Sequence, residues 1–325
     1  MRHTRRKFLG AASAAACLGT FTLTHAATFP SRPVRLIVPY APGGLPDTVA
    51  RIVGRRLSEK LGQAFVVENM PGAGGAVAAR ALARAAADGH TFLVTDGPLL
   101  AIVPFVMARP AFNAQKDFVP VSLIGTAPLY LAVHANVKAN TLDELVALAK
   151  AKPGALTIGS AGLGSIHHLT AAAMQAGLGI NITHVPFRGS GQSVPAMLGG
   201  HVDMVFASPP MLMGFVQTGQ IRLIAVNSAK RLPQTPNVPT LAEKIPGFDF
   251  AFNVVVFARP GTPQEVIEKM NAEIARVVKE PEVVEELQRA GVDPIGAPVQ
   301  QTTAAFRSEM QRIAAAAQQA GLKPE

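Results

Sequence analysis

Strand and helix signals alternate along the chain from residue 34 onward, and this alternation limits the possible folds more than any other feature. Residues 34–39 form a compact apolar segment typical of a strand, and a Pro-Gly-Gly turn follows it. Residues 47–61 then carry apolar side chains at four-residue spacing, which predicts an amphipathic helix. Because strands that alternate with helices of this length form βαβ units, the sequence predicts an α/β fold with mainly parallel sheets.

The alternation continues through most of the chain and ends in helices. Thr141 to Glu144 matches a capping box at a helix start, and Pro263 stands at the favoured first position of another helix. Further helices are expected at residues 76–87, 282–289 and 302–320. Further strands are expected at residues 65–67, 91–95, 119–124, 129–133, 156–159, 182–185, 202–206, 221–226 and 248–257.

Two α/β blocks followed by a helical return predict two lobes. If the tail packs on the first block, the chain passes between the lobes twice, near Thr126 and near Phe248. The predicted division is residues 27–125 with 249–325 for lobe 1 and residues 126–248 for lobe 2.

The first 26 residues have the features of an export signal. Arg2, Arg5, Arg6 and Lys7 precede an uncharged, Ala-rich run, and small residues near Ala26 fit a cleavage site. The paired arginines match the twin-arginine export pattern, with an ordinary Sec signal as the alternative. A lipoprotein processing site at Cys17 is the weaker alternative, because apolar residues continue beyond the cysteine. We therefore expect a soluble periplasmic protein.

Composition excludes several classes of function. Cys17 is the single cysteine, so the mature chain is expected to have no disulfide, thiol nucleophile or thiolate metal site. Loss of the four basic residues of the signal lowers the net charge from +9 to +5. The remaining Lys and Arg are scattered without interleaved aromatic residues, which argues against nucleic-acid binding.

Three loops share a strand, a run of glycine and hydroxyl residues, and a helix start. Glycines allow backbone amides to approach a ligand, and a helix N-terminus offers unpaired N–H groups with partial positive charge. Such loops suit a carboxylate, although each could also be a tight turn, with Asp47, Ser165 and Ser193 as plain helix caps. The loops comprise residues 40–47, 160–165 and 188–193.

Signatures of catalysis and of metal binding are missing from the sequence. There is no nucleophile elbow, phosphate-binding loop or dinucleotide fingerprint. His167 and His168 are adjacent and do not form the i, i+4 pair that zinc favours. We expect no cofactor and no metal, and a hydrolase using Ser165 with His168 is kept only as an alternative.

Several short segments along the chain resemble the corresponding segments of the tripartite tricarboxylate transporter receptors, also called Bug proteins. The resemblance covers nearly the whole mature chain in order. Its matching segments are Pro39-Tyr40-Ala41-Pro42-Gly43-Gly44, Pro71-Gly72-Ala73-Gly74-Gly75, Asp88-Gly89-His90-Thr91, Gly159-Ser160-Ala161-Gly162, His184-Val185-Pro186-Phe187, Gly199-Gly200-His201-Val202-Asp203 and Pro260-Gly261-Thr262-Pro263. It implies a two-lobed periplasmic-binding-protein fold of the Venus flytrap type that closes on a solute without chemistry.

The resemblance also implies where the solute lies. Carboxylates in this family are held largely by backbone amides and ordered waters. The residues implicated in lobe 1 are Tyr40, Ala41, Gly43, Gly44 and Asp47, and those in lobe 2 are Ser160, Ala161, Gly164, Ser165, His168, Arg188, Gly189 and Ser190.

Asp96 departs from the family pattern, in which small polar residues follow the third strand. One hypothesis is that Asp96 contacts a cationic group, so that the solute is an amino acid; the alternative is that Asp96 caps the helix that begins near Pro98. The chain also lacks the tryptophans common in relatives, which leaves the solute's size open.

The leading interpretation is a monomeric receptor that delivers a small carboxylate to the membrane components of a tripartite tricarboxylate transporter. Closure of the lobes around the solute would create the form that docks. A sensory binding protein that reports to a membrane kinase uses the same clamp and stays an alternative.

Overall fold

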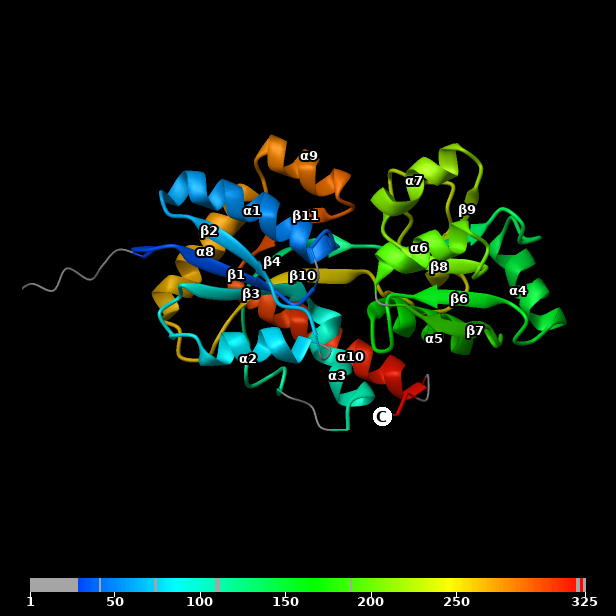
Figure 1. Ribbon diagram of the computed structural model, residues 1–325, viewed down its shortest axis with the longest axis horizontal. Coiled ribbons are helices and arrows are strands. Elements are labelled where there is room, and N and C mark those ends of the chain that lie inside the picture. Colours follow the sequence, from blue (N-terminus) through cyan, green and yellow to red (C-terminus); the bar gives the residue numbers. More distant parts are fainter. Residues whose placement is uncertain are drawn as a thin grey trace, which may run out of the picture.

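Two mixed β-sheets organise the protein into two lobes. The computed structural model describes residues 29–40, 42–72, 75–108, 112–187, 189–319 and 322–323, and the proposed signal at 1–26 lies outside them. One sheet has the order β11-β4-β10-β3-β1-β2 and the other has the order β7-β6-β8-β5-β9. Figure 1 shows the two sheets side by side along the long axis, each flanked by helices. The α/β two-lobed fold is therefore confirmed.

Lobe 1 is built from both ends of the chain. Its strands are β1 (Val34–Val38), β2 (Phe65–Asn69), β3 (Thr91–Asp96), β4 (Val119–Ala127), β10 (Phe252–Ala258) and β11 (Asp293–Ala297). Its helices are α1 (Leu45–Leu61), α2 (Ala76–Arg84), α3 (Gly97–Val106), α8 (Gln264–Val277), α9 (Pro281–Arg289) and α10 (Val299–Gln319).

Lobe 2 comes from the middle of the chain. Its strands are β5 (Tyr130–His134), β6 (Thr157–Ser160), β7 (Thr183–Pro186), β8 (Met204–Ala207) and β9 (Ile221–Val226). Its helices are α4 (Leu142–Ala151), α5 (Ile166–Leu178), α6 (Ser190–Leu198) and α7 (Pro209–Gln217), with a short 3-10 turn at Leu241–Glu243.

Some expected boundaries are wrong for local reasons. The strand expected at 248–257 begins only at Phe252, because the amide of Phe250 donates to the carbonyl of Asn227 instead of joining the sheet. Pro263 is the N-cap of α8 rather than its first residue. Thr141 caps α4 as expected. The return bond of a capping box differs, because the Glu144 carboxylate accepts from the amide of Asn140 instead of the amide of Thr141.

The edge strand β11 was not anticipated. Its sequence Asp-Pro-Ile-Gly-Ala contains a proline and a glycine, both of which are disfavoured inside strands. It pairs antiparallel with β4 and has a register irregularity between Pro294 and Ala297. Tertiary pairing at the sheet edge therefore overrides a weak local strand preference.

The chain passes between the sheets at residues 128–129 and 227–251. The two passages are adjacent because Phe252 at the start of β10 pairs with Ala127 at the end of β4. Asn227 joins them: its side-chain oxygen accepts from the amide of Leu129 at 2.7 Å, and its side-chain nitrogen donates to the carbonyl of Phe250 at 2.8 Å. Asn227 is fully buried, so these bonds form away from competing water.

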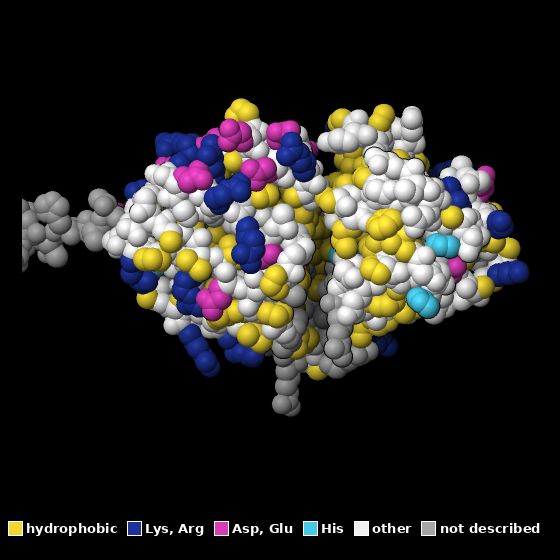
Figure 2. Space-filling model, turned by 45° about the horizontal axis from the view of Figure 1, so that its top comes forward, with side chains coloured by type: hydrophobic (Ala, Val, Ile, Leu, Met, Phe, Trp, Pro, Cys, Tyr) yellow, Lys and Arg dark blue, Asp and Glu magenta, His cyan; other side chains and the backbone are white. Residues whose placement is uncertain are grey.

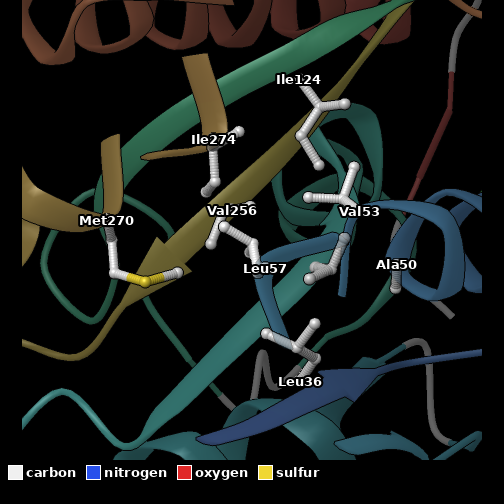
Figure 3. Close-up of a pocket in the computed structure, with 9 residues that line it drawn as sticks. Leu36, Ala50, Val53, Leu57, Ile124, Val256, Met270 and Ile274 are labelled. Carbon is white, nitrogen blue, oxygen red and sulfur yellow. The ribbon is translucent and has the colours of Figure 1, made fainter. Parts of the chain in front are cut away.

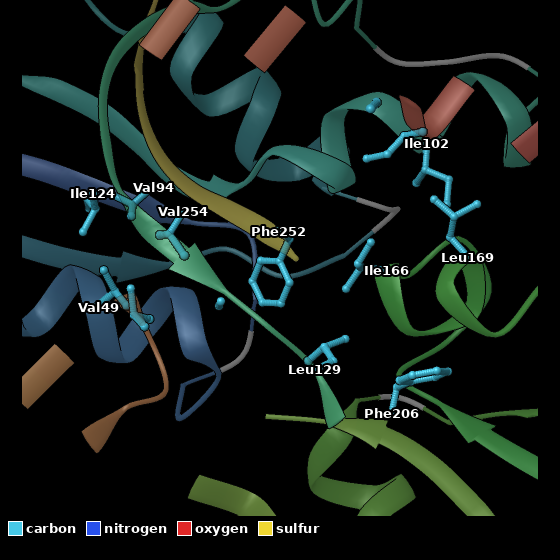
Figure 4. Close-up of a cluster of buried hydrophobic side chains, with 14 of the residues drawn as sticks. Val49, Val94, Ile102, Ile124, Leu129, Ile166, Leu169, Phe206, Phe252 and Val254 are labelled. Atoms are coloured by element: carbon cyan, nitrogen blue, oxygen red, sulfur yellow. The ribbon is translucent and has the colours of Figure 1, made fainter. Parts of the chain in front are cut away.

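One apolar cluster continues from lobe 1 into lobe 2. It includes Ile102 of α3 together with Ile166 and Leu169 of α5, which Figure 4 shows on facing elements. Helix α10 of lobe 1 also packs against α5. On the α9 and α7 side of Figure 1, a Cβ placed on Gly291 would lie 3.0 Å from Pro209. The lobes therefore touch on two sides.

The core of lobe 1 contains a small void of about 10 Å³. Aliphatic side chains of α1, the sheet and α8 line it, among them Leu36, Leu57 and Met270, as Figure 3 shows. The void is no larger than a single water, so it is a packing defect rather than a solute site. No helix in the described part of the chain is both long and apolar enough to cross a membrane.

Candidate functional site

The register of the strands brings six loops to the gap between the lobes. In lobe 1, Val254 near the start of β10 pairs with Asp96 at the end of β3, and β1 and β2 run parallel to β3. In lobe 2, Tyr130 at the start of β5 pairs with Ala207 at the end of β8. Since β10 and β5 begin where the chain enters each lobe, the carboxyl ends of the neighbouring parallel strands face the other lobe.

Figure 2 shows a furrow between the lobes. The strand register brings these loops to the same gap. Ligands of open α/β sheets bind outside the carboxyl ends of the strands, where loops and helix N-termini converge. The furrow is therefore the candidate solute site. The loops follow β1, β2 and β3 in lobe 1 and β6, β7 and β8 in lobe 2.

Asp47 fixes the first loop of lobe 1 instead of pointing freely into the furrow. Its carboxylate accepts from the amide of Gly43 at 2.8 Å, from the side chain of Asn69 at 2.9 Å and from Arg51 at 3.1 Å. Burial opposes ionisation, but the bonds from Arg51, Gly43 and Asn69 lower the pKa of Asp47 below its usual value. Gly44, rather than Asp47, is the N-cap of α1. Asp47 thus shapes the loop that carries Gly43.

Tyr40 and Asp96 join this loop to the end of β3. The Tyr40 hydroxyl donates to Asp96 Oδ2, and Asp96 Oδ1 accepts from the amide of Leu99 at 2.9 Å as the N-cap of α3. Burial raises the pKa of Asp96, although these hydrogen bonds oppose the rise. Only 6% of Asp96 is exposed. Asp96 therefore acts as a helix cap, which was the alternative to binding a cationic group. Both of its carboxylate oxygens already accept hydrogen bonds from the protein.

Ser160 and Ser165 shape the first loop of lobe 2. Ser160 is fully buried, and its hydroxyl lies 2.7 Å from His184 Nε2 while it accepts from the amide of Gly162. Ser165 caps α5 by accepting from the amide of His168, and its hydroxyl donates to the carbonyl of Gly162. Neither hydroxyl is therefore free. Between them, Ala161 offers a backbone amide, whereas the amide of Gly164 donates to His168 Nδ1 at 3.3 Å.

Two histidines, one from α5 and one from β7, stack beside this loop. The rings of His168 and His184 lie 4.2 Å apart and nearly parallel. His168 Nδ1 accepts from the amide of Gly164, which leaves the proton of the neutral ring on Nε2 as a donor. Burial lowers the pKa of His168, and burial followed by the neighbouring His168 lowers the pKa of His184 to about 4. Both rings are thus neutral hydrogen-bonding groups at neutral pH.

His167 connects the N-termini of α5 and α6. Its Nε2 lies 3.1 Å from the hydroxyl of Ser190, the first residue of α6. Gly189 is the N-cap of α6 and has a φ of 143°, a conformation that side chains disfavour. The predicted site residues Ala41 and Arg188 lie outside the described residues.

Sequence reasoning missed two residues of these loops. His184 has no spacing signal of its own in the sequence, and only the pairing of β6 with β7 places it beside Ser160. Ser208 follows β8 and is the N-cap of α7, but its hydroxyl makes no cap hydrogen bond. Pro209 and Pro210 follow it and have no N–H groups, so Ser208 supplies the polar group of this loop. A hydroxyl residue between a strand and a helix was the available signal for Ser208.

Neutral donors dominate the furrow. In the described parts of the six loops no side chain is positively charged. Arg51 and Arg55 line a groove of about 600 Å³ beside α1, which Gly43 and Asp47 of the first loop also line. There the two arginines pair with Asp47 and Glu286. The described residues contain no group of three or more His, Cys, Asp or Glu that could hold a metal ion. The loops can therefore hold an anion with amides, hydroxyls and neutral imidazole.

The chain matches a known protein family over most of its length. The family model described as "Tripartite tricarboxylate transporter family receptor" matches residues 49–322. The chain is 37% identical over 310 residues to the "UPF0065 protein in tcbD-tcbE intergenic region" of Pseudomonas sp. (strain P51), covering 95% of this chain and 92% of that protein.

Two solved structures from Rhodopseudomonas palustris share the fold. Rpa4515 with adipate superimposes with a TM-score of 0.85 at 32% identity, covering 91% of this chain and 100% of that one. MatC (Rpa3494) with bound malate gives a TM-score of 0.79 at 30% identity, covering 89% and 100% respectively. Both bound molecules carry two carboxyl groups.

Proposed function

The chain belongs to the tripartite tricarboxylate transporter receptor family, and from this premise we propose that it captures a small dicarboxylate between its lobes. The family is one of binding proteins rather than enzymes. The observation that carries the proposal is the facing pair of loop sets, which offer neutral donors and helix N-termini from both lobes.

A solute with an acid group at each end fits this arrangement. The first loop of lobe 1 presents the N-terminus of α1, and lobe 2 presents the N-termini of α5 and α6. Each N-terminus carries roughly half a positive charge and unpaired N–H groups. Two such ends therefore stabilise two carboxylates without a charged side chain.

A dicarboxylate is favoured over an amino acid. The amino-acid hypothesis required Asp96 to bind an ammonium group, but Tyr40 and the amide of Leu99 already occupy its carboxylate. Relatives with adipate and with malate support the same choice.

The ligand contacts that we propose in lobe 1 are the backbone of Ala41 and Gly44, next to Gly43, whose amide is held by Asp47. In lobe 2 they are the amides of Ala161, Gly189 and Ser190 and the ring of His168, with Arg188 at the border. Gly164 supports this loop instead, because its amide donates to His168 Nδ1. Tyr40, Asp47, Asp96, Ser160 and Ser165 support these loops through the hydrogen bonds described above.

Capture would be a shift between open and closed arrangements of two bodies. We propose residues 27–125 with 249–325 as one body and 126–248 as the other, turning about the adjacent passages held by Asn227. The closed form would deliver the solute to the membrane components of a tripartite tricarboxylate transporter. The signal at 1–26 supports a periplasmic location.

Binding by the mature chain tests the proposal. Thermal-shift and calorimetric titrations should compare linear dicarboxylates, malate, citrate and glutamate, with the matching monocarboxylates as controls. Because a ligand at one hundred times its Kd stabilises the native state by about 2.7 kcal/mol, true ligands should raise Tm clearly. Failure of every di- and tricarboxylate to raise Tm would refute the proposal.

Gly191 provides a sharper test of the site. It is the second residue of α6, is exposed, has no positive φ, and a Cβ there would meet nothing within 4 Å. Gly191→Ala should therefore raise helix stability by up to about 1 kcal/mol while weakening solute binding, because the methyl group occupies the approach to the amides. Gly214→Ala is the matched control, since Gly214 is also helical, exposed and unobstructed. Equal affinities in the two variants would place the solute elsewhere.

A further inference from the structure

A buried acid on α10 lies behind the first loop of lobe 1 and has no part in the site described above. Glu309 is only 2% exposed. Its Oε1 accepts from the amide of Asn253 at 3.0 Å, while its Oε2 is enclosed and has no partner among the described residues. An unpaired carboxylate oxygen is costly to bury, so this oxygen requires an explanation.

Gly97 makes room for this acid directly beside Asp96. A Cβ at Gly97 would fall 2.0 Å from Glu309 Oε2, so any larger residue would displace the carboxyl group. Burial raises the pKa of Glu309 to about 8; the bonds from Asn253 oppose this rise, the charge of Asp96 adds to it, and Arg312 opposes it. Glu309 is therefore protonated at neutral pH, and the charge of Asp96 opposes its ionisation.

The pair connects the ligand loop to the passages between the lobes. Asp96 accepts from the hydroxyl of Tyr40, whose loop faces the furrow. Asn253, held by Glu309, pairs with Thr126 just before the first passage and follows the second passage. Val254 next to it pairs with Asp96. Glu309 thus binds β10 through the amide of Asn253 and packs against Gly97, the residue that follows the partner of Tyr40.

The elements packed against α10 bring few titratable residues near Glu309. Helix α3 and strands β4 and β10, which pack against α10, have no titratable residue. Helix α5 brings His167 and His168. Arg312, one turn along α10, is shared with Asp249 of the second passage at 3.4 Å. The charged residues of α8 are Glu265, Glu268, Lys269, Glu273 and Arg276, and Arg276 pairs with Glu273.

We propose that protonated Glu309 is a positioning residue that holds Tyr40 and β10 in the capture-competent arrangement, so that solute affinity falls when Glu309 ionises. This inference rests on the proposed function. With Glu309 ionised, two negative charges share one buried site. Their repulsion is relieved by moving either Asp96, which releases Tyr40, or the Glu309 side chain, which releases the amide of Asn253.

The affinity for adipate should be measured by calorimetry between pH 6.5 and 9. Adipate keeps both charges over this range, so a change reports on the protein. We expect the wild-type affinity to fall about tenfold for each unit by which solute binding raises the pKa of Glu309. Glu309→Gln should bind as the wild type does at pH 7 and lose this fall. Glu268→Gln, which removes an exposed carboxylate from α8, should keep it.

A second measurement does not need a solute. The chain has two tyrosines and no tryptophan, so Tyr130→Phe leaves Tyr40 as the sole tyrosine, whose emission can be excited apart from that of phenylalanine. We expect a step in its emission near pH 8 that is absent from the Tyr130→Phe, Glu309→Gln double variant. The inference is overturned if this step is absent, or if Glu309→Gln retains the pH-dependent affinity. Failure of every dicarboxylate to bind while the step is present would refute the proposed function instead.

Discussion

Acidification should destabilise lobe 2 through His167, the residue that joins α5 to α6. Part of the residue's surface remains exposed, but Nδ1 is fully enclosed and has no partner among the described residues. Burial lowers the pKa of His167 from 6.5 to about 4. Between these two values the folded protein keeps the ring neutral, while the unfolded chain binds a proton.

The sign and the size follow from that difference. Because the unfolded state binds more protons, the free energy of unfolding decreases as pH falls from about 6.5 to about 4. Above that window His167 is neutral in both states, so it lowers the free energy of unfolding no further. A difference of about 2.5 units, at 1.36 kcal/mol for each, gives at most about 3 kcal/mol. This is a large share of the roughly 5–15 kcal/mol that stabilises a typical domain.

Urea unfolding at pH values from 7 to 4 measures this contribution. His167→Gln keeps a polar group near Ser190 but has no proton to take up in this range, so its stability should fall less on acidification than that of the wild type. The difference between the two curves isolates His167 from Glu309 and His184, which also titrate. His201→Gln, at an exposed histidine, is the control and should follow the wild type. Parallel curves for wild type and His167→Gln would refute the reasoning.

Three further substitutions test the support of the site and the core. Asn227→Ala removes the two side-chain bonds that join the passages and should lower the free energy of unfolding by about 2–4 kcal/mol, measured by urea unfolding. Asp47→Ala leaves the amide of Gly43 without its acceptor and should weaken dicarboxylate binding about tenfold, measured by calorimetry. Leu57→Ala enlarges the existing void of lobe 1 and should lower Tm through a loss of about 2–5 kcal/mol, whereas affinity should stay within twofold.

Periodicity was enough to predict most strands and helices. The apolar spacing of residues 47–61 corresponds to α1, and the short apolar runs correspond to β1, β3 and β9. Strand β11 and the start of β10 were not predicted correctly, because backbone pairing with β4 and with Asn227 decides them. Local preference is weak where a distant partner provides the hydrogen bonds.

The sequence also indicated the loops of the candidate site, but not the hydrogen-bond and stacking partners of their side chains. Glycine and hydroxyl residues before helices predicted turns at residues 40–47 and 160–165, which follow β1 and β6 in the structure. It did not indicate that Asp47 binds Gly43 and Asn69, or that His184 stacks on His168. These partners come from different strands, so their meeting depends on sheet order rather than on spacing.

By itself, then, the sequence determined the α/β class, the two-lobed layout and the family, since all three are written in local periodicity and in ordered motifs. Only the tertiary structure decided which polar groups are free for a solute and which are already paired. It also placed Glu309 beside Asp96, residues 213 positions apart, whose packing through Gly97 no local pattern encodes. The physical reason is that the charge and availability of a buried group depend on its neighbours in space.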